Sequence, residues 1–192
     1  MALIGFERMT IRVLDGAAPV TSGAGKNIFV IQGDEGEGAT YSAKISGLGD
    51  SVVTYGSNKP YHTAIGNIKL ELETVDIPEE VLNVVSGFDE TVGVVTLGQK
   101  LTPPKCAVLL ESHSLSEEDA LIGFYEGYFT PSDIEMNTLE EKTEELAKDK
   151  LTFTAYASTD SATKGKRMVK YLGSESTEIA TLKAGLKMTA AV

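Results

Sequence analysis

The sequence is poor in the residues that most often carry chemistry. Its 192 residues include one cysteine, two histidines and no tryptophan. A single cysteine excludes an internal disulfide, so we expect a reducing compartment or indifference to redox state. A chain of this length buries about 70% of its unfolded surface, so it can build a core without disulfides or metal.

Long apolar runs are also missing. No segment approaches the roughly 20 apolar residues that a membrane-spanning helix needs. Glu7 and Arg8 interrupt the start after a few apolar residues, so we expect no signal peptide. The sequence shows no repeat, low-complexity tract or obvious linker, and its length fits one large domain or two small ones.

Positive charge is scarce and unevenly placed. The chain has 17 basic and 28 acidic residues, a net charge of −11. Residues 101–150 hold 12 acidic and 4 basic residues, whereas residues 151–192 hold 3 acidic and 6 basic ones. Such an acidic surface disfavours nucleic-acid binding, which depends on neutralised phosphates. Solubility alone explains the acidity, but the unlike ends also suit head-to-tail contacts between copies.

The candidate catalytic residues are Cys106, His62 and His113. Cys106 begins the apolar run CAVLLE, which favours a buried, inert thiol over a nucleophile. No flanking pattern selects either histidine, and ordinary surface positions are the more common outcome. A triad of Cys106, His113 and an acidic residue is the weaker alternative. We therefore predict that the protein is not an enzyme and has no catalytic residue.

Two segments bear a superficial likeness to ligand-binding loops. Residues 23–26 resemble a phosphate loop, but Val20 and Asn27 stand where that motif needs Gly and Ser or Thr. The acidic residues 34–38 lack the ligand spacing of a calcium loop, because glycines stand where oxygens are needed. We predict solvated loops at both places, and no metal or cofactor site.

The sequence is instead rich in short strand patterns bounded by turns. Alternating apolar and polar residues, or brief apolar runs, mark most of them. We predict strands at residues 4–15, 27–32, 40–45, 51–55, 68–73, 94–97, 106–111, 121–130 and 151–158. Many short strands with one firm helix predict a mainly β fold, an antiparallel sandwich or barrel flanked by one short helix.

The clearest unit is residues 68–95, a strand followed by a helix and a glycine turn. Asp76 is a candidate N-cap, and Gly87 allows the chain to leave the helix through positive φ. The apolar positions of the helix fall on one face: Ile77, Val81, Val84, Val85 and Phe88. One short helix with a single apolar face needs a sheet to pack against.

Two later segments are weaker. A capping box at Thr138 favours a helix over residues 139–150, but so few residues are apolar there that we favour a loop or ragged strand. Residues 134–138 form a short strand candidate. Ile179, Leu182 and Leu186 could line a weak terminal helix, which Gly185 interrupts.

The order of several stretches resembles the phage major tail protein family, the tail tube subunits of long-tailed bacterial viruses. The stretches are VTYGSNKPY at 53–61, the segment ELETVDIPEEVLNVVSGFDETVGVV at 71–95, PPKCAVLLE at 103–111, YEGYFTPS at 125–132, then EEKTEEL and LTFTAYA. None is a catalytic signature, so their order carries the likeness. We predict a tail-tube-like β domain at residues 1–158 and a C-terminal extension at residues 159–192.

The resemblance implies a structural virion protein of the tail, synthesised in the host cytoplasm. Hexameric rings of this subunit would stack into a hollow tube that conducts DNA during ejection. Its partners would be copies of itself, a tape measure protein and a tail terminator, and DNA would pass without specific binding. Lys69, Glu71 and Glu73 are candidates to face the lumen, if the wet face of their strand points inward.

Two alternatives remain beside this interpretation. The tube of type VI secretion is built from similar hexameric rings. A monomeric β-sandwich that binds carbohydrate or protein would instead need an exposed aromatic platform. Tyr125, Tyr128 and Phe129 form the only dense aromatic cluster, although packing in the core is the more common role for such residues.

Overall fold

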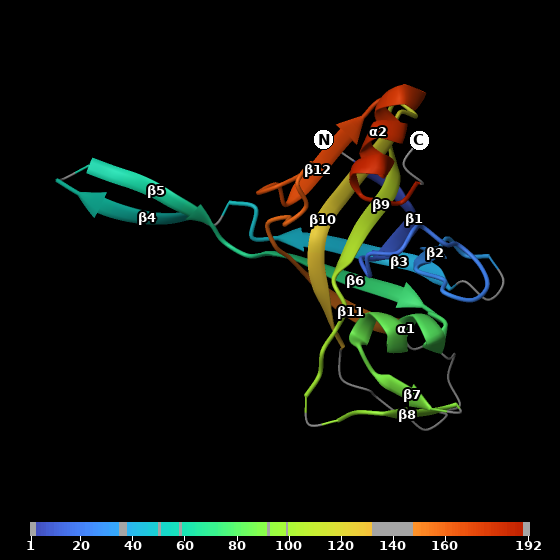
Figure 1. The fold of residues 1–192 in the computed structure, drawn as a ribbon. Coiled ribbons are helices and arrows are strands. Elements are labelled where there is room, and N and C mark those ends of the chain that lie inside the picture. The colour runs from blue at the N-terminus through green and yellow to red at the C-terminus, as the bar shows by residue number, and fades with distance from the viewer. Residues whose placement is uncertain are drawn as a thin grey trace, which may run out of the picture.

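The computed structural model describes residues 3–34, 38–49, 51–57, 59–91, 93–98, 100–131 and 148–189. Figure 1 shows the elements. In chain order they are β1 (Leu3–Val13), β2 (Ile28–Ile31), β3 (Ala39–Ser46), β4 (Ser51–Gly56), β5 (Lys59–Ile65), β6 (Ile68–Val75), α1 (Glu79–Ser86), β7 (Asp89–Thr91), β8 (Val94–Thr96), β9 (Cys106–Ser114), β10 (Asp119–Pro131), β11 (Lys148–Ala155), β12 (Met168–Leu172) and α2 (Ser176–Gly185).

Most strands belong to one sheet. Its order is β2-β1-β9-β10-β11-β6-β3, and β12 pairs with β10 beside this path. Every pairing in it is antiparallel. The hairpins β4–β5 and β7–β8 form two separate two-stranded sheets. The predicted mainly β, antiparallel fold is therefore confirmed.

The sheet is open but strongly curled. Its path of paired strands ends at β2 and β3, yet β3 returns toward β1, where Thr40 Oγ1 donates to the Phe6 carbonyl oxygen at 2.6 Å. The curl encloses one main core. Its largest fully buried apolar side chains include Met9, Ile11, Phe29, Ile31, Leu70, Leu72, Phe124, Phe129 and Phe153.

The strand β6 shows how sequence pattern becomes packing. Ile68, Leu70 and Leu72 are buried, and the residues between them point to the other face, as predicted. In the neighbouring strand β11, Phe153 lies opposite Leu70 and Leu151 opposite Leu72. The two alternating patterns therefore fix the register, since a slip by one residue would expose both apolar sets.

The helix α1 packs on this core, with two departures from the prediction. Asp76 is not its N-cap: Pro78 holds that position without a side-chain hydrogen bond, and Asp76 has φ 55° in the turn after β6. Val84 lies outside the buried face and is 37% exposed. Gly87 ends the helix at φ 73° as predicted, and a Cβ there would lie 2.6 Å from the Thr102 carbonyl oxygen.

The chain after residue 158 adds two elements. β12, which the sequence analysis did not predict, pairs with β10, and the weak terminal helix is confirmed as α2. Leu182 and Leu186 of α2 pack on Ala107, Leu109 and Leu121 from the opposite side of the sheet, which makes a second apolar cluster. The division of the chain at residue 158 stays a prediction.

Two predicted features lie outside the described residues. These are the strand candidate at 134–138 and most of the segment 139–150, of which Lys148 to Lys150 begin β11 as strand. Among the described helices, neither α1 nor α2 has the length and apolar character to span a membrane.

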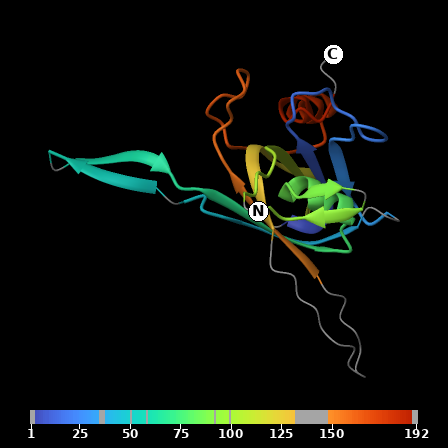
Figure 2. The same ribbon diagram turned by 60° about the horizontal axis from the view of Figure 1, so that its bottom comes forward.

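The hairpin β4–β5 projects away from the body of the molecule as an arm (Figures 1 and 2). Its base is fastened from the C-terminal side, where Arg167 Nη1 donates to the Gly66 carbonyl oxygen at 2.7 Å. The arm therefore leaves the sheet between β3 and β6 without belonging to it.

Candidate functional site

One face of the sheet is mainly polar where four strands lie side by side. The strands are β3, β6, β11 and the C-terminal half of β10. Strand alternation places the outward side chains of all four on one surface, which we call the polar face. Its residues are Ser42, Lys44, Ser46, Lys69, Glu71, Glu73, Lys150, Thr152, Thr154, Tyr128 and Thr130.

The charges of the polar face are mixed. Lys44 Nζ lies 3.4 Å from Glu71 Oε2, and Ser42 Oγ donates to Glu73 Oε2 at 3.0 Å. Lys150 stands opposite Glu73 in the register of β11 and β6. The three predicted lumen candidates, Lys69, Glu71 and Glu73, therefore do share one outward surface, and basic residues accompany its carboxylates.

Another part of this side of the sheet is covered by a helix. α2 lies over β9 and the N-terminal half of β10, where Leu182 and Leu186 bury Leu109 and Leu121. Among the described residues, no helix covers the polar face. The structure thus leaves a four-stranded, mainly polar surface that ends at the outermost strand β3.

A buried arginine holds the loop that follows β1. The Arg12 side chain is only 2% exposed and is surrounded by carbonyl oxygens. It donates from Nη1 to Val13 at 2.6 Å, from Nη2 to Ala17 at 2.6 Å and from Nε to Lys187 at 3.0 Å. Because Lys187 follows α2, Arg12 joins the two ends of the described chain.

Asp15 completes this network. It lies 3.5 Å from Arg12 Nη1, and its carboxylate accepts hydrogen bonds from the Ala17 N–H and the Asn27 side chain. Burial raises the pKa of Asp15, but these hydrogen bonds and the Arg12 charge outweigh it and hold that pKa below its ordinary value. The network is structural, because its donors and acceptors satisfy one another.

A second buried charge, Glu126, anchors the loop between β11 and β12. Its Oε1 lies 2.7 Å from Lys105 Nζ, and its Oε2 accepts from the N–H and the hydroxyl of Thr159, both at 2.8 Å. Burial raises the pKa of Glu126, but the hydrogen bonds from Lys105 and Thr159 and the Lys105 charge leave it below its ordinary value.

His113 belongs to a surface network of polar contacts. Its Nε2 lies 2.9 Å from Glu7 Oε2, and its Nδ1 lies 3.3 Å from Asp119 Oδ1. Glu111 beside it contacts Arg8 at 3.1 Å and Lys183 at 2.8 Å. These groups line a cavity of about 550 Å³ between β1, β9 and α2. No cluster of His, Cys, Asp or Glu in the described part of the chain could hold a metal ion.

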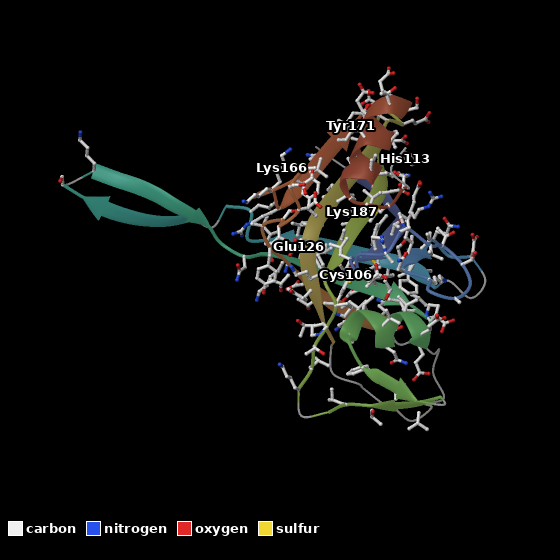
Figure 3. The ribbon with its side chains drawn as sticks, viewed as in Figure 1. Cys106, His113, Glu126, Lys166, Tyr171 and Lys187 are labelled. Atoms are coloured by element: carbon white, nitrogen blue, oxygen red, sulfur yellow. The ribbon has the colours of Figure 1, made fainter. Side chains whose placement is uncertain are left out.

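The predicted alternative of a Cys106 and His113 triad finds no support in the geometry. Burial raises the pKa of Cys106 to about 12, although the Arg12 charge lowers it slightly. The two residues lie at opposite ends of β9, seven positions apart in the sequence, or about 23 Å at the rise of a strand. Figure 3 shows them well separated. The side chain of His62, in β5, is outside the described part of the structure.

The aromatic cluster does not form a platform. Phe129 is fully buried and packs on Phe153 with ring centroids 5.0 Å apart. Tyr125 packs against the cluster under α2. Tyr128 points to the polar face, where its ring meets Tyr156 edge-on at 5.7 Å. The three side chains therefore lie in three different environments: the main core, the cluster under α2 and the polar face.

The comparison with known families gives one match. A model of the phage tail tube protein family matches residues 1–180, and so extends past β12 into α2. A search of curated proteins found no match. The family is one of structural proteins, which agrees with ion pairs and buried charges that satisfy one another. The chain thus belongs to the phage tail tube protein family, and it is a structural subunit of the virion tail that assembles with copies of itself into a tube.

Proposed function

We propose that this subunit forms hexameric rings that stack into a hollow tube, and that the polar face lines the lumen through which DNA is ejected. The observation that carries the proposal is the polar face itself. It spans four strands, bears charged and hydroxyl groups, and is left bare by both helices. A surface with these properties suits contact with water and a sliding polymer.

The outermost strand supports the closing of a ring. β3 ends the path of paired strands, and an exposed strand edge is an aggregation liability that proteins usually cover. Pairing β3 of one copy with the sheet of the next copy would remove this edge and continue the polar face from subunit to subunit. Such a contact joins two different surfaces, so it can close into a ring while stacking stays open-ended.

The charge pattern supports passage of DNA without retention. Proteins hold DNA through cations that neutralise phosphates and release counterions. On the polar face, Lys44 is paired with Glu71, and Lys150 stands opposite Glu73. The mixed pattern therefore offers no continuous basic track, and the net charge of −11 per chain repels DNA from the subunit as a whole.

The same proposal extends to the other components of the tail. The tube would assemble around a tape measure protein in the host cytoplasm and be closed by a tail terminator. It would remain in the virion until ejection. The arm β4–β5, which the body does not use for its own fold, would reach a neighbouring subunit.

Electron microscopy of the purified protein tests the proposal. Concentrated protein, or protein seeded with tail initiation complexes, should give rings with six-fold class averages and hollow filaments. Labelling tests the orientation of the subunit: a cysteine replacing Thr152 on the polar face should react with a bulky maleimide in monomers and be protected in filaments. Monodisperse monomers under all these conditions would refute the proposal.

A further inference from the structure

The end of the molecule that carries α1 has an exposed apolar surface with an acidic rim. Val84 of α1 is 37% exposed, and Val94 and Leu97 at the β7–β8 hairpin are 62% and 67% exposed. Glu79 and Glu80 lie exposed in the first turn of α1, and neither makes an ion pair with a described residue. We call these five residues the acidic patch.

The hairpin within this patch has little support of its own. β7 and β8 have three residues each and pair only with one another among the described strands. An isolated two-stranded hairpin is marginal in water, and large apolar side chains at its surface add to that cost. The hairpin lies beside α1 in both Figures 1 and 2. The patch is therefore a surface that gains stability when it is covered.

The opposite end carries a complementary surface. Lys164, Lys166 and Lys170 lie exposed on β12 and the loop before it, and none is ion-paired with a described residue. Leu172, two positions after Lys170 and so on the same face of β12, is 43% exposed. Figures 1 and 3 place β12 and Lys166 far from α1 across the main sheet. We call these four residues the basic patch.

We infer that the basic patch of one copy docks on the acidic patch of the next copy. Each patch combines exposed apolar side chains with charges of one sign, and the signs are opposite. Copies with a net charge of −11 repel one another, so a contact between them needs a local attraction of this kind. Because the patches lie at opposite ends, the contact is head-to-tail and cannot be satisfied within a symmetric dimer.

The inference deepens the proposed function, since it assigns one of the subunit contacts that a tube requires. It differs from pairing at the β3 edge, which depends on backbone groups and is little affected by salt. The patch contact places exposed charges in apposition, so it should weaken as ionic strength rises above about 0.15 M, where the screening length falls below 8 Å. Only one of the two contacts is therefore electrostatic.

A charge swap tests the inference. The variant Lys166→Glu with Lys170→Glu should reduce filament formation at least tenfold by light scattering and electron microscopy, and so should Glu79→Lys with Glu80→Lys. Combining all four substitutions restores opposite signs and should recover assembly toward the wild-type level. All the changed residues are exposed, so each monomer should stay folded by circular dichroism and cooperative thermal unfolding.

Matched controls separate this contact from net charge and from the tube itself. Lys26→Glu with Thr21→Glu and Ser22→Glu makes the same change in charge, −4, at exposed positions outside both patches and the polar face, and should leave assembly unchanged. If the wild type assembles and either patch variant assembles equally well, or if the four-fold variant fails to recover, the inference is wrong while the proposed tube stands. Failure of the wild type to assemble would instead count against the tube.

Discussion

At the scale of single residues, the fold depends on polar groups that a hydrophobicity pattern does not reveal. Arg12 occupies a position on β1 whose neighbours are buried, and its side chain donates to three carbonyl groups. The hydrogen bond to Val13 is buried, and those to Ala17 and Lys187 are partly buried. Such a residue is costly to remove, because buried acceptors then lose their donor.

Replacing Arg12 by Met should therefore lower the free energy of unfolding by about 3 kcal/mol, since the carbonyl groups of Val13, Ala17 and Lys187 lose their donor. Urea denaturation of the monomer measures the loss. Arg8 is the matched control, because it lies on the same strand but its side chain is 46% exposed and its partner is Glu111. Arg8→Met should cost less than about 1 kcal/mol, and an equal loss in both variants would contradict the role of burial.

Glu126 gives a prediction on pH dependence. Its pKa in the folded state lies below its ordinary value of 4.5, so its contribution is fully present above that value and is lost as pH falls through the lowered pKa. Glu126→Gln should therefore flatten the loss of stability below about pH 4.5, and also lower stability near pH 7. Unfolding free energies measured from pH 7 down to acid check this. Glu178→Gln, at an exposed site, should keep the wild-type profile.

At the scale of elements, the sequence correctly predicted those features that depend on local residue pattern. The alternation in β6 and the glycine end of α1 were correct, because both follow from side-chain period and backbone geometry. β12 was missed, because Lys166, Arg167 and Lys170 resemble a solvated loop and the pairing with β10 is a long-range contact. The N-cap was wrong because the Ile77 N–H donates instead to a carboxylate on another strand, that of Asp149, at 3.1 Å.

The polar face was predicted only in part, because local pattern gives the alternation within a strand but not which strands are neighbours. Alternation placed Lys69, Glu71 and Glu73 on one wet face, but the extent of that face depends on which strands lie beside β6. The ion pair of Lys44 with Glu71 joins residues 27 positions apart, and the contact of Glu126 with Lys105 joins the interior of β10 to the residue before β9. Contacts of this range leave no trace in a local sequence pattern.

A substitution at the register shift in β10 tests how closely the sheet and the core are packed there. The register between β9 and β10 shifts between Phe124 and Gly127, and a Cβ on Gly127 would lie 2.3 Å from the Phe153 ring and 2.4 Å from the Thr154 carbonyl oxygen. Gly127→Ala should destabilise the fold by about 2 kcal/mol through overpacking. Gly98→Ala is the control, because no atom lies within 4 Å of its Cβ position. Thermal denaturation should separate the two variants by several degrees.

At the scale of the whole molecule, the charge balance of the polar face can be altered without touching the core. Glu71→Lys with Glu73→Lys would turn this surface basic, and each subunit of a ring would repeat the change. We expect tubes of normal appearance that retain DNA in low salt and release it as salt rises, measured by co-sedimentation. Glu118→Lys with Glu178→Lys carries the same charge change away from the face, and equal DNA retention by that control would contradict the assignment of the lumen.

The β4–β5 arm is a feature that the monomer does not need for its main sheet and core. The chain segments at its base lie against each other, since a Cβ on Gly47 would meet the Asn67 carbonyl oxygen at 2.3 Å, and Ser46 pairs with Lys69. Replacing residues 51–65 by a short Gly-Ser linker should therefore keep the sheet, the core and the thermal midpoint of the monomer. Assembly should fail if, as proposed, the arm reaches a neighbouring subunit, because an isolated two-stranded hairpin is marginally stable by itself. Filaments of normal length from this variant, seen by electron microscopy, would show that the arm has no part in joining subunits.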